Sequence, residues 1–195
     1  MQTPPDFMTE LGSALQHCLA MLGRGVSDRR HAFHTPTLAS VDANGLPQAR
    51  ALVLRGFDPA GRVLRFHTDR RAGKFADVSA NPAVCVHAYD PKSALQLRLA
   101  GTARLLLPET DAPARQAWEA SQEMSRRCYA ITPGPGEVID APLPAPGDAQ
   151  AGIGNFAVLC VAVSRLEFLW LHASGHRRAA YDWQGDVCEA RWLVP

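Results

Sequence analysis

The fold is decided by residues 37–68, which read TLASVDANGLPQARALVLRGFDPAGRVLRFHT. Runs rich in β-branched and apolar residues, typical of short strands, alternate here with two turn sequences. Asp42 to Gly45 (DANG) ends in Asn-Gly, which suits the positive φ of a tight hairpin, and Asp58 to Gly61 (DPAG) is a second turn sequence. The strands are expected at 37–41, 48–56 and 62–68. The stretch therefore predicts an antiparallel meander.

The pattern extends on both sides of this meander. Leu95 to Leu107 begins by alternating apolar with polar side chains, as a half-buried strand does. The other strands are expected at 83–89, 155–163 and 165–171 and in a hairpin at 179–193, and helices at 9–23, 71–79 and 111–127. Gly23 is expected to end the first helix. Residues 132–154 hold five prolines and five glycines, which predicts a long loop that forms the wall of a site.

Six or more antiparallel strands with few helices predict a mainly β fold, a closed β-barrel with α-helical additions. A length of 195 residues is that of one domain. We therefore expect a single domain over residues 1–195. Its expected parts are an N-terminal helix at about 9–23, a barrel core at about 36–107, a helix and Pro-rich loop at 111–154, and C-terminal strands at 155–195.

The composition argues against several classes of protein. The 20 basic and 19 acidic residues nearly cancel, so no nucleic-acid partner is expected. No apolar run approaches the roughly 18 residues of a membrane span, and the first residues lack the order of a secretory signal. Five widely spaced cysteines predict a cytoplasmic protein without disulfides. No metal site is expected, because the pairs His31/His34 and His172/His176 lack a third ligand.

Positive charge is concentrated between residues 50 and 74. Seven bases stand there against two acids, and nearly all of the bases are arginine. They are Arg50, Arg55, Arg62, Arg65, Arg70, Arg71 and Lys74. Arginines on a strand together with a base at the start of the next helix form a good phosphate receptor. The alternative is a solvated strand face whose arginine stems cover apolar surface.

Two further groups of polar residues stand out. Gln96 and Arg98 lie on one face of an otherwise apolar strand, where Gln96 is either a satisfied polar group or a ligand for a heteroaromatic ring. Residues 174–178 (SGHRR) form a basic loop between two strands. Residues 152–157 (GIGNFA) match a loose dinucleotide fingerprint, but they lead into a β-branched strand and are rejected.

Taken together, these residues resemble the pyridoxamine 5'-phosphate oxidase superfamily, whose members bind FMN in an antiparallel, Greek-key-like split β-barrel. The resemblance runs from about Thr37 to Gly101 and returns from Leu166 to Pro195. It implies that Arg50 opens the strand that binds the flavin phosphate and that Arg55 ends it. The positions between them, implied to face the flavin, are Ala51, Leu52, Val53 and Leu54.

Other positions match the family one by one. His67 and Thr68 fall on flavin-contact positions, and Lys74 on a phosphate contact. Lys74 follows Gly73, where the oxidase has an arginine that Arg71 is expected to replace. The remaining matches are Gln96 and Trp170 as flavin contacts, Arg178 on the flavin side and His176 on the substrate side.

The resemblance implies an FMN-dependent oxidoreductase that acts on a small molecule, with FMN at the interface of a homodimer. A cation such as Arg178 near the ring stabilises the negative charge that develops on reduction. The substrate site is expected to be altered, because Ser174 stands where the oxidase has an arginine. The alternatives are a non-catalytic flavin- or haem-binding protein on the same barrel, and a structural dimer whose arginines are only solvated.

Overall fold

The computed structural model describes residues 5–144 and 148–195, so part of the predicted 132–154 loop and the first four residues lie outside the described ranges. In these ranges, nine strands form one antiparallel sheet. They are β1 (Thr37–Val41), β2 (Pro47–Ala51), β3 (Leu54–Asp58), β4 (Val63–Asp69), β5 (Ala83–Asp90), β6 (Leu95–Leu106), β7 (Phe156–Trp170), β8 (Arg177–Gln184) and β9 (Val187–Leu193). The predicted mainly β fold is confirmed.

The sheet does not close on itself within the described residues. Its strand order is β2-β1-β5-β6-β7-β4-β3, and β8 and β9 branch from β7. The strand expected at 48–56 is broken after Ala51, so β2 and β3 stand at opposite ends of this path, joined only by Leu52 and Val53. The closed barrel predicted from the strand pattern is therefore wrong. At the split, β2 and β3 are connected only along the chain and not by hydrogen bonds between strands.

Strand β7 is a single 15-residue strand where two separate strands were expected. A register shift opposite Ala100 and Gly101 leaves Ser164 as an extra residue in β7. As a result, Val161 and Val163 face the core before the shift, and Leu166 and Phe168 face it afterwards. The bulge thus turns the next polar side chains of β7 to the outer face of the sheet.

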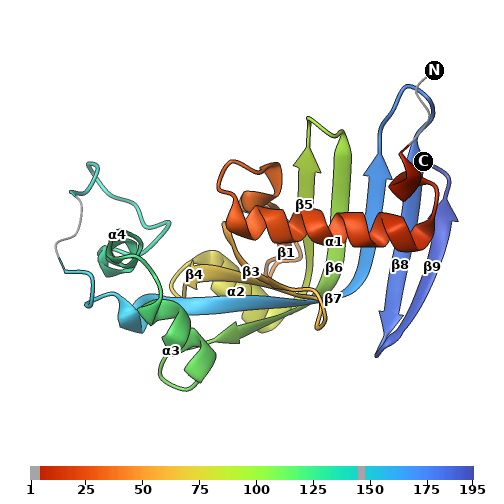
Figure 1. Ribbon diagram of the computed structural model, residues 1–195. Helices are drawn as coiled ribbons and strands as arrows, with labels where there is room; N and C mark the ends of the chain where they lie inside the picture. The colour runs from red at the N-terminus through yellow and green to blue at the C-terminus, as the bar shows by residue number, and fades with distance from the viewer. Residues whose placement is uncertain (1–4, 145–147) are drawn as a thin grey trace.

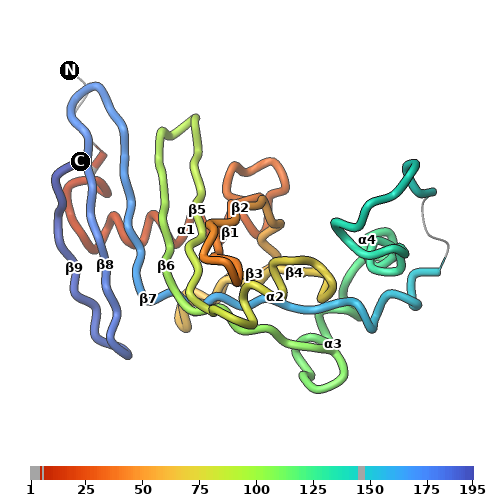
Figure 2. Tube along the Cα trace, turned by 180° about the vertical axis from the view of Figure 1, so that it is seen from behind, coloured from red at the N-terminus to blue at the C-terminus, as the bar shows by residue number. Residues whose placement is uncertain are grey.

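Helix α1 (Leu11–Ser27) covers one face of the sheet. It lies in front of the strands in Figure 1 and behind them in Figure 2. Tyr181 of β8 donates a hydrogen bond from its hydroxyl to the Leu11 carbonyl at 2.7 Å, which ties the helix to the far end of the sheet. The main core lies between α1 and the sheet, with Phe33, Phe66 and Phe168 fully buried.

The other helices are shorter. They are α2 (Gly73–Ala80), α3 (Ala112–Glu119), α4 (Glu123–Arg127) and the short 3-10 turns η1 (Asp6–Met8), η2 (Ala32–His34), η3 (Cys128–Ala130) and η4 (Ile153–Asn155). Of these, η1, η2 and α2 add Met8, Phe33 and Val78 to the main core. Trp118 of α3 packs with Phe156 in a second, smaller core. The helix expected at 111–127 is thus two helices, and α4 projects at one end of the molecule (Figure 1). Among the described residues, no helix is long and apolar enough to cross a membrane.

The prediction that Gly23 ends the first helix is wrong, because α1 continues to Ser27. A Cβ on Gly25 would lie 2.6 Å from the Phe33 carbonyl oxygen, so this glycine lets the η2 turn pack directly on the helix backbone. Tertiary packing therefore outweighs the low helix propensity of two glycines.

These two glycines should respond in opposite ways to substitution. Gly23→Ala should stabilise the fold by about 0.5–1 kcal/mol, because alanine favours helix and no atom lies within 4 Å of the added Cβ. Gly25→Ala should destabilise it by roughly 1–3 kcal/mol through the clash with Phe33. Urea unfolding of the two variants checks this, and equal effects would contradict the packing described here.

Candidate functional site

Arg50 lies in a polar cluster formed by β1, β2 and α2. Its guanidinium donates to the Ser40 hydroxyl at 2.6 Å and to the Asp77 carboxylate at 3.1 Å, and Ser40 also donates to Asp77 at 3.0 Å. Lys74 stands three residues before Asp77 on α2 and interacts electrostatically with Arg50 and Asp77. We call Ser40, Arg50, Lys74 and Asp77 the Arg50 cluster. Its members other than Arg50 and Lys74 were not singled out from the sequence.

Lys74 is half-buried, and its surroundings disfavour the charged form of its side chain. Burial lowers the pKa of Lys74 below its usual value, and the positive charge of Arg50 lowers it further, while Asp69 and Asp77 oppose the shift. Helix α2 begins at Gly73 without a side-chain cap or an acidic residue in its first turn. Two cations and an uncapped helix N-terminus are a donor set that fits a phosphate group.

Arg71 is already engaged within the chain. Its guanidinium donates to both oxygens of Asp69, at 3.0 and 2.7 Å, and to the Ile131 carbonyl at 2.9 Å. This pairing raises the pKa of Arg71. Arg71 therefore connects β4 to the loop after α4 through these hydrogen bonds. That Arg71 replaces the missing family arginine stays a prediction.

A second group of cations lines a pocket of about 290 Å³ on the face of β4 that points away from the core. Arg55 comes from β3 and Arg65 and His67 from β4, and the opposite wall is formed around α3 and α4. The full lining is Arg29, Arg55, Arg65, His67, Ala117, Ala120, Ser121, Gln122 and Ser125. No carboxylate belongs to this lining. We call it the basic pocket.

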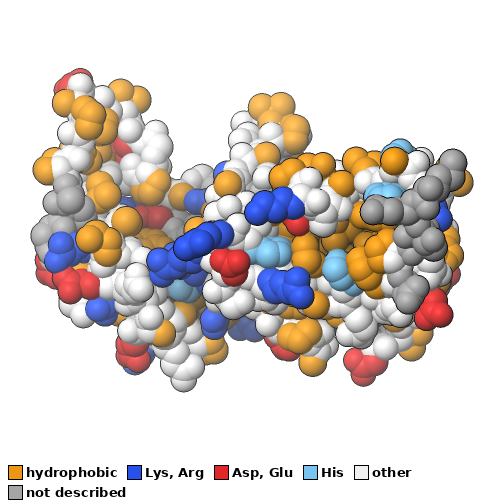
Figure 3. Space-filling model, turned by 45° about the horizontal axis from the view of Figure 1, so that its top comes forward, with side chains coloured by type: hydrophobic (Ala, Val, Ile, Leu, Met, Phe, Trp, Pro, Cys, Tyr) orange, Lys and Arg blue, Asp and Glu red, His pale blue; other side chains and the backbone are white. Residues whose placement is uncertain are grey.

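Two buried nitrogens in the basic pocket lack partners in the described part of the chain, Nε of Arg55 and Nε2 of His67. Burial, with the nearby charges of Arg55 and Arg65, lowers the pKa of His67 to about 4. His67 is therefore neutral at neutral pH, and the two arginines supply the positive charge. The unpartnered Nε–H of Arg55, next to uncompensated cations, fits an anionic group. In Figure 3, Lys and Arg side chains gather near the middle of the visible face, with acidic side chains among them.

Gln96 and Arg178 share the outer face of the sheet. In the ladder, Gln96 of β6 pairs with Leu169 of β7, which pairs with Arg178 of β8. Their side chains therefore flank one position from two sides. Arg178 donates from Nε and Nη2 to one carboxylate oxygen of Glu167, at 3.1 and 2.7 Å.

The structure separates some residues that the resemblance grouped together. Trp170 alternates with Glu167 and Leu169 along β7, so it lies on the core face, 6% exposed, with its indole donating to the Ser93 carbonyl. His67 and Thr68 point to opposite faces of β4 for the same reason, and Thr68 is buried. Along the 51–54 segment, Leu54 is buried in the core and the positions before it are at least partly exposed.

His176 lies in the connection between β7 and β8. Its Nδ1 accepts a hydrogen bond from the His172 backbone N–H at 3.2 Å. The hydroxyl oxygen of Ser174 lies 2.7 Å from Nδ1 of His172, and this contact stabilises the turn. His176 and Arg178 both line a cavity of about 420 Å³ at the end of β8 and β9.

Arg50 and the outer-face pair occupy opposite sides of the sheet. Arg50 pairs with Leu38, which pairs with Val86, and both of these are core residues, so Arg50 projects on the core side. Gln96 and Arg178 alternate with core residues along their strands and project outward. Within one chain, these predicted flavin contacts do not converge.

Comparison with known proteins supports the resemblance to the pyridoxamine 5'-phosphate oxidase superfamily. Residues 15–107 match the sequence model of the pyridoxamine 5'-phosphate oxidase FMN-binding domain. A pyridoxine/pyridoxamine 5'-phosphate oxidase of Anaeromyxobacter dehalogenans is 28% identical, covering 89% of this chain and 91% of that protein. The oxidase of Idiomarina loihiensis is 43% identical, but over only 26% of this chain and 23% of its own length.

A solved structure extends the match to three dimensions. A pyridoxamine 5'-phosphate oxidase-related, FMN-binding protein of Nostoc punctiforme superposes with a TM-score of 0.78 at 28% identity, covering 92% of this chain and 96% of that one. The matched part of the chain, residues 15–107, is thus a pyridoxamine 5'-phosphate oxidase FMN-binding domain, with the split-barrel fold and FMN as its cofactor.

Proposed function

We propose that the protein is an FMN-dependent oxidoreductase that works as a homodimer and acts on a small molecule carrying an anionic group. The observation that supports an anionic group on the substrate is the basic pocket. Its lining holds three arginines and two unpartnered nitrogens but no carboxylate. A phosphate or carboxylate would satisfy these donors. This makes the pocket the substrate-recognition part of the site.

The two-fold arrangement is supported by the faces on which the predicted flavin contacts lie. Arg50 and Lys74 of one copy would hold the phosphate of FMN at the start of α2. Gln96 and Arg178 of a second copy would hold the ring from the outer face of its sheet. A C2 dimer forms two such sites with one interface. FMN, when bound, supplies the group that accepts electrons from the substrate.

The chain's own residues would orient the substrate and manage charge. Arg55 and Arg65 would bind the anionic group, and neutral His67 would offer Nε2 as one hydrogen-bond partner. Arg178 would stabilise the negative charge that develops beside it. His176, in the connection just before β8, would contact the substrate.

A second candidate is a non-catalytic flavin- or haem-binding protein on the same barrel. Ser174 favours it, because this residue replaces a family arginine and bonds to His172 within its own turn. The proposed cytoplasmic location rests on the five free cysteines, since a reducing compartment keeps thiols free.

The deciding experiment is purification without added cofactor, followed by absorption spectroscopy and sedimentation. We expect a yellow dimer that releases FMN on denaturation. Oxygen uptake is then measured with pyridoxamine 5'-phosphate and with unphosphorylated pyridoxamine. Turnover that requires the phosphate supports the oxidase and the basic pocket. A flavoprotein without turnover of either compound supports the second candidate, and a colourless monomer that binds no added FMN contradicts both.

The affinity for FMN should fall as pH rises, earlier than for an ordinary lysine site. The charged ammonium of Lys74 is the form that attracts phosphate, and its lowered pKa means that the charge is lost at lower pH than usual. Affinity should therefore be full below this pKa and decline above it. Flavin fluorescence titrations between about pH 7 and about pH 10 measure this, and Lys74→Arg, which stays charged, should remove the decline.

A further inference from the structure

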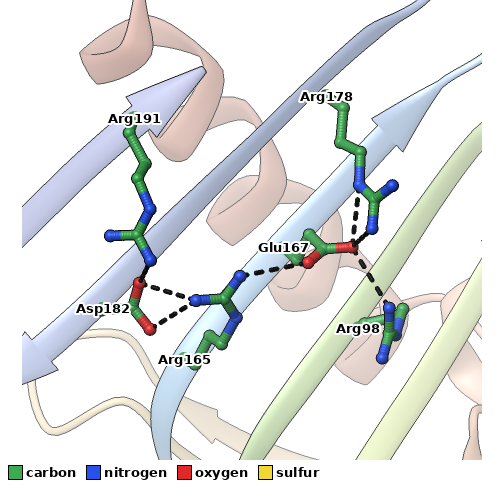
Figure 4. A network of polar contacts seen from close by, with 6 residues as sticks. All are labelled: Arg98, Arg165, Glu167, Arg178, Asp182 and Arg191. Atoms are coloured by element: carbon green, nitrogen blue, oxygen red, sulfur yellow. Dashed lines mark hydrogen bonds and ion pairs between the residues drawn. The ribbon is translucent and has the colours of Figure 1, made fainter. Parts of the chain in front are cut away.

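Glu167 is a buried carboxylate at the centre of an arginine network on the outer face (Figure 4). It is 7% exposed and lies in the apolar run LEFLW of β7. Oε1 accepts from Arg178 and, at 3.3 Å, from Arg98, and Oε2 accepts from Arg165, also at 3.3 Å. Three arginines from three strands therefore meet on one carboxylate.

The same network continues away from Arg178. Arg165 donates to both oxygens of Asp182 at 2.8 Å, and Arg191 lies 2.6 Å from Asp182. Arg191 also lies 3.7 Å from Glu189, so four arginines share three carboxylates, which leaves a surplus of one positive charge in this network. Burial alone would raise the pKa of Glu167, but the hydrogen bonds from Arg178 and Arg165 outweigh it and keep the pKa below its usual value.

The contact with Arg178 is the most directional in this network. Nε and Nη2 both bind the same oxygen, so the plane of the guanidinium is fixed relative to the sheet. Arg178 is only partly exposed, and Gln96 lies across Leu169 from it. An arginine held in this way loses little further freedom when it binds a ligand.

We propose that Glu167 is a positioning residue of the flavin site, whose carboxylate fixes the guanidinium of Arg178 in the orientation that meets the ring of FMN. This inference rests on the proposed function, because it takes Arg178 as a flavin contact. Glu167 itself does not touch FMN in this account and acts only through Arg178.

A purely electrostatic role predicts the opposite sign. If Glu167 only reduced the positive charge of the outer face, removing its charge would strengthen the attraction for an anionic ligand. If it positions Arg178, losing the contact would weaken binding whatever the net charge. Glu167→Gln removes the charge and keeps the size, whereas Glu167→Asp keeps the charge and withdraws the oxygens by one methylene.

The test is the dissociation constant of FMN, measured by flavin fluorescence for both variants. We expect each to bind FMN about tenfold more weakly than the wild type. Asp182→Asn is the matched control, since it removes a carboxylate from the same network that does not contact Arg178, and it should change binding by less than about twofold. Thermal unfolding of each variant separates a loss of folding from a loss of affinity.

A double variant tests whether Glu167 affects FMN binding through Arg178. In an Arg178→Ala background, Glu167→Gln should cause no further loss of FMN affinity, because its target is gone. Tighter or unchanged FMN binding in Glu167→Gln, or additive losses in the double variant, would overturn the inference alone. Wild-type affinity in Arg178→Ala would overturn the flavin role of Arg178 in the proposed function, and this inference with it.

Discussion

Arg50→Ala should bind FMN roughly 10- to 100-fold more weakly than the wild-type chain. A hydrogen-bonded contact between charged groups contributes about 1.5–3 kcal/mol, and each 1.4 kcal/mol is tenfold in affinity. The guanidinium of Arg50 is already oriented by Ser40 and Asp77, so it meets a phosphate with little loss of freedom. Fluorescence titration with FMN measures the change, and unchanged affinity would show that the phosphate binds elsewhere.

Asp77 provides the control for this experiment. Its side chain is 11% exposed, and Arg50→Ala removes its ion pair with Arg50 and leaves the Ser40 hydroxyl bond and the more distant charge of Lys74. The single variant should therefore also lose roughly 2–3 kcal/mol of unfolding free energy. Adding Asp77→Asn should restore most of that stability but not the FMN affinity. If the double variant regained tight binding, the affinity loss would be a consequence of unfolding and not of the missing cation.

The sequence was most informative where structure is decided locally. The turn sequences between Val41 and Val63 contain their own conformational preference, so the hairpins β1–β2 and β3–β4 were predicted correctly, although the break after Ala51 keeps them from forming one meander. The end of α1 was not, because the contact that keeps Gly25 helical comes from Phe33, which only the folded chain brings close. The break of one expected strand into β2 and β3 has the same kind of cause, because β2 pairs with β1 and β3 pairs with β4, and these two partners lie apart in the sheet.

The sequence could predict which types of residue form the site, but not the face of the sheet on which each residue lies. Alternation assigns side chains to faces only along a regular strand, and both β3 and β7 contain register shifts. The acidic partners were missed for another reason. Asp77 and Glu167 are each a single acid in an ordinary sequence context, and their importance comes from arginines on other strands. A lone acid inside the apolar run of β7 was the one available signal for Glu167.

The bulge in β7 is the structural basis of the outer-face site, and Gly101 is the residue that permits it. A Cβ at this position would collide with the Ala162 carbonyl oxygen and lie 3.0 Å from Cα of Val163, and both of these are backbone atoms of a central strand. Neither can move without disturbing the ladder between β6 and β7. Gly101→Ala should therefore destabilise the fold by about 3 kcal/mol or more, measured by urea unfolding.

Gly56→Ala is the matched control, because Gly56 also stands at a register shift between two strands. Its Cβ would meet only the mobile end of the Arg65 side chain, at 2.9 Å, so the cost should stay below about 1 kcal/mol. Because the shift opposite Gly101 turns Glu167 outward, any Gly101→Ala protein that still folds should also bind FMN more weakly. Wild-type FMN affinity in such a folded variant would show that the bulge is not needed to present Arg178, while equal stability of the two glycine variants would contradict the close approach of β6 and β7.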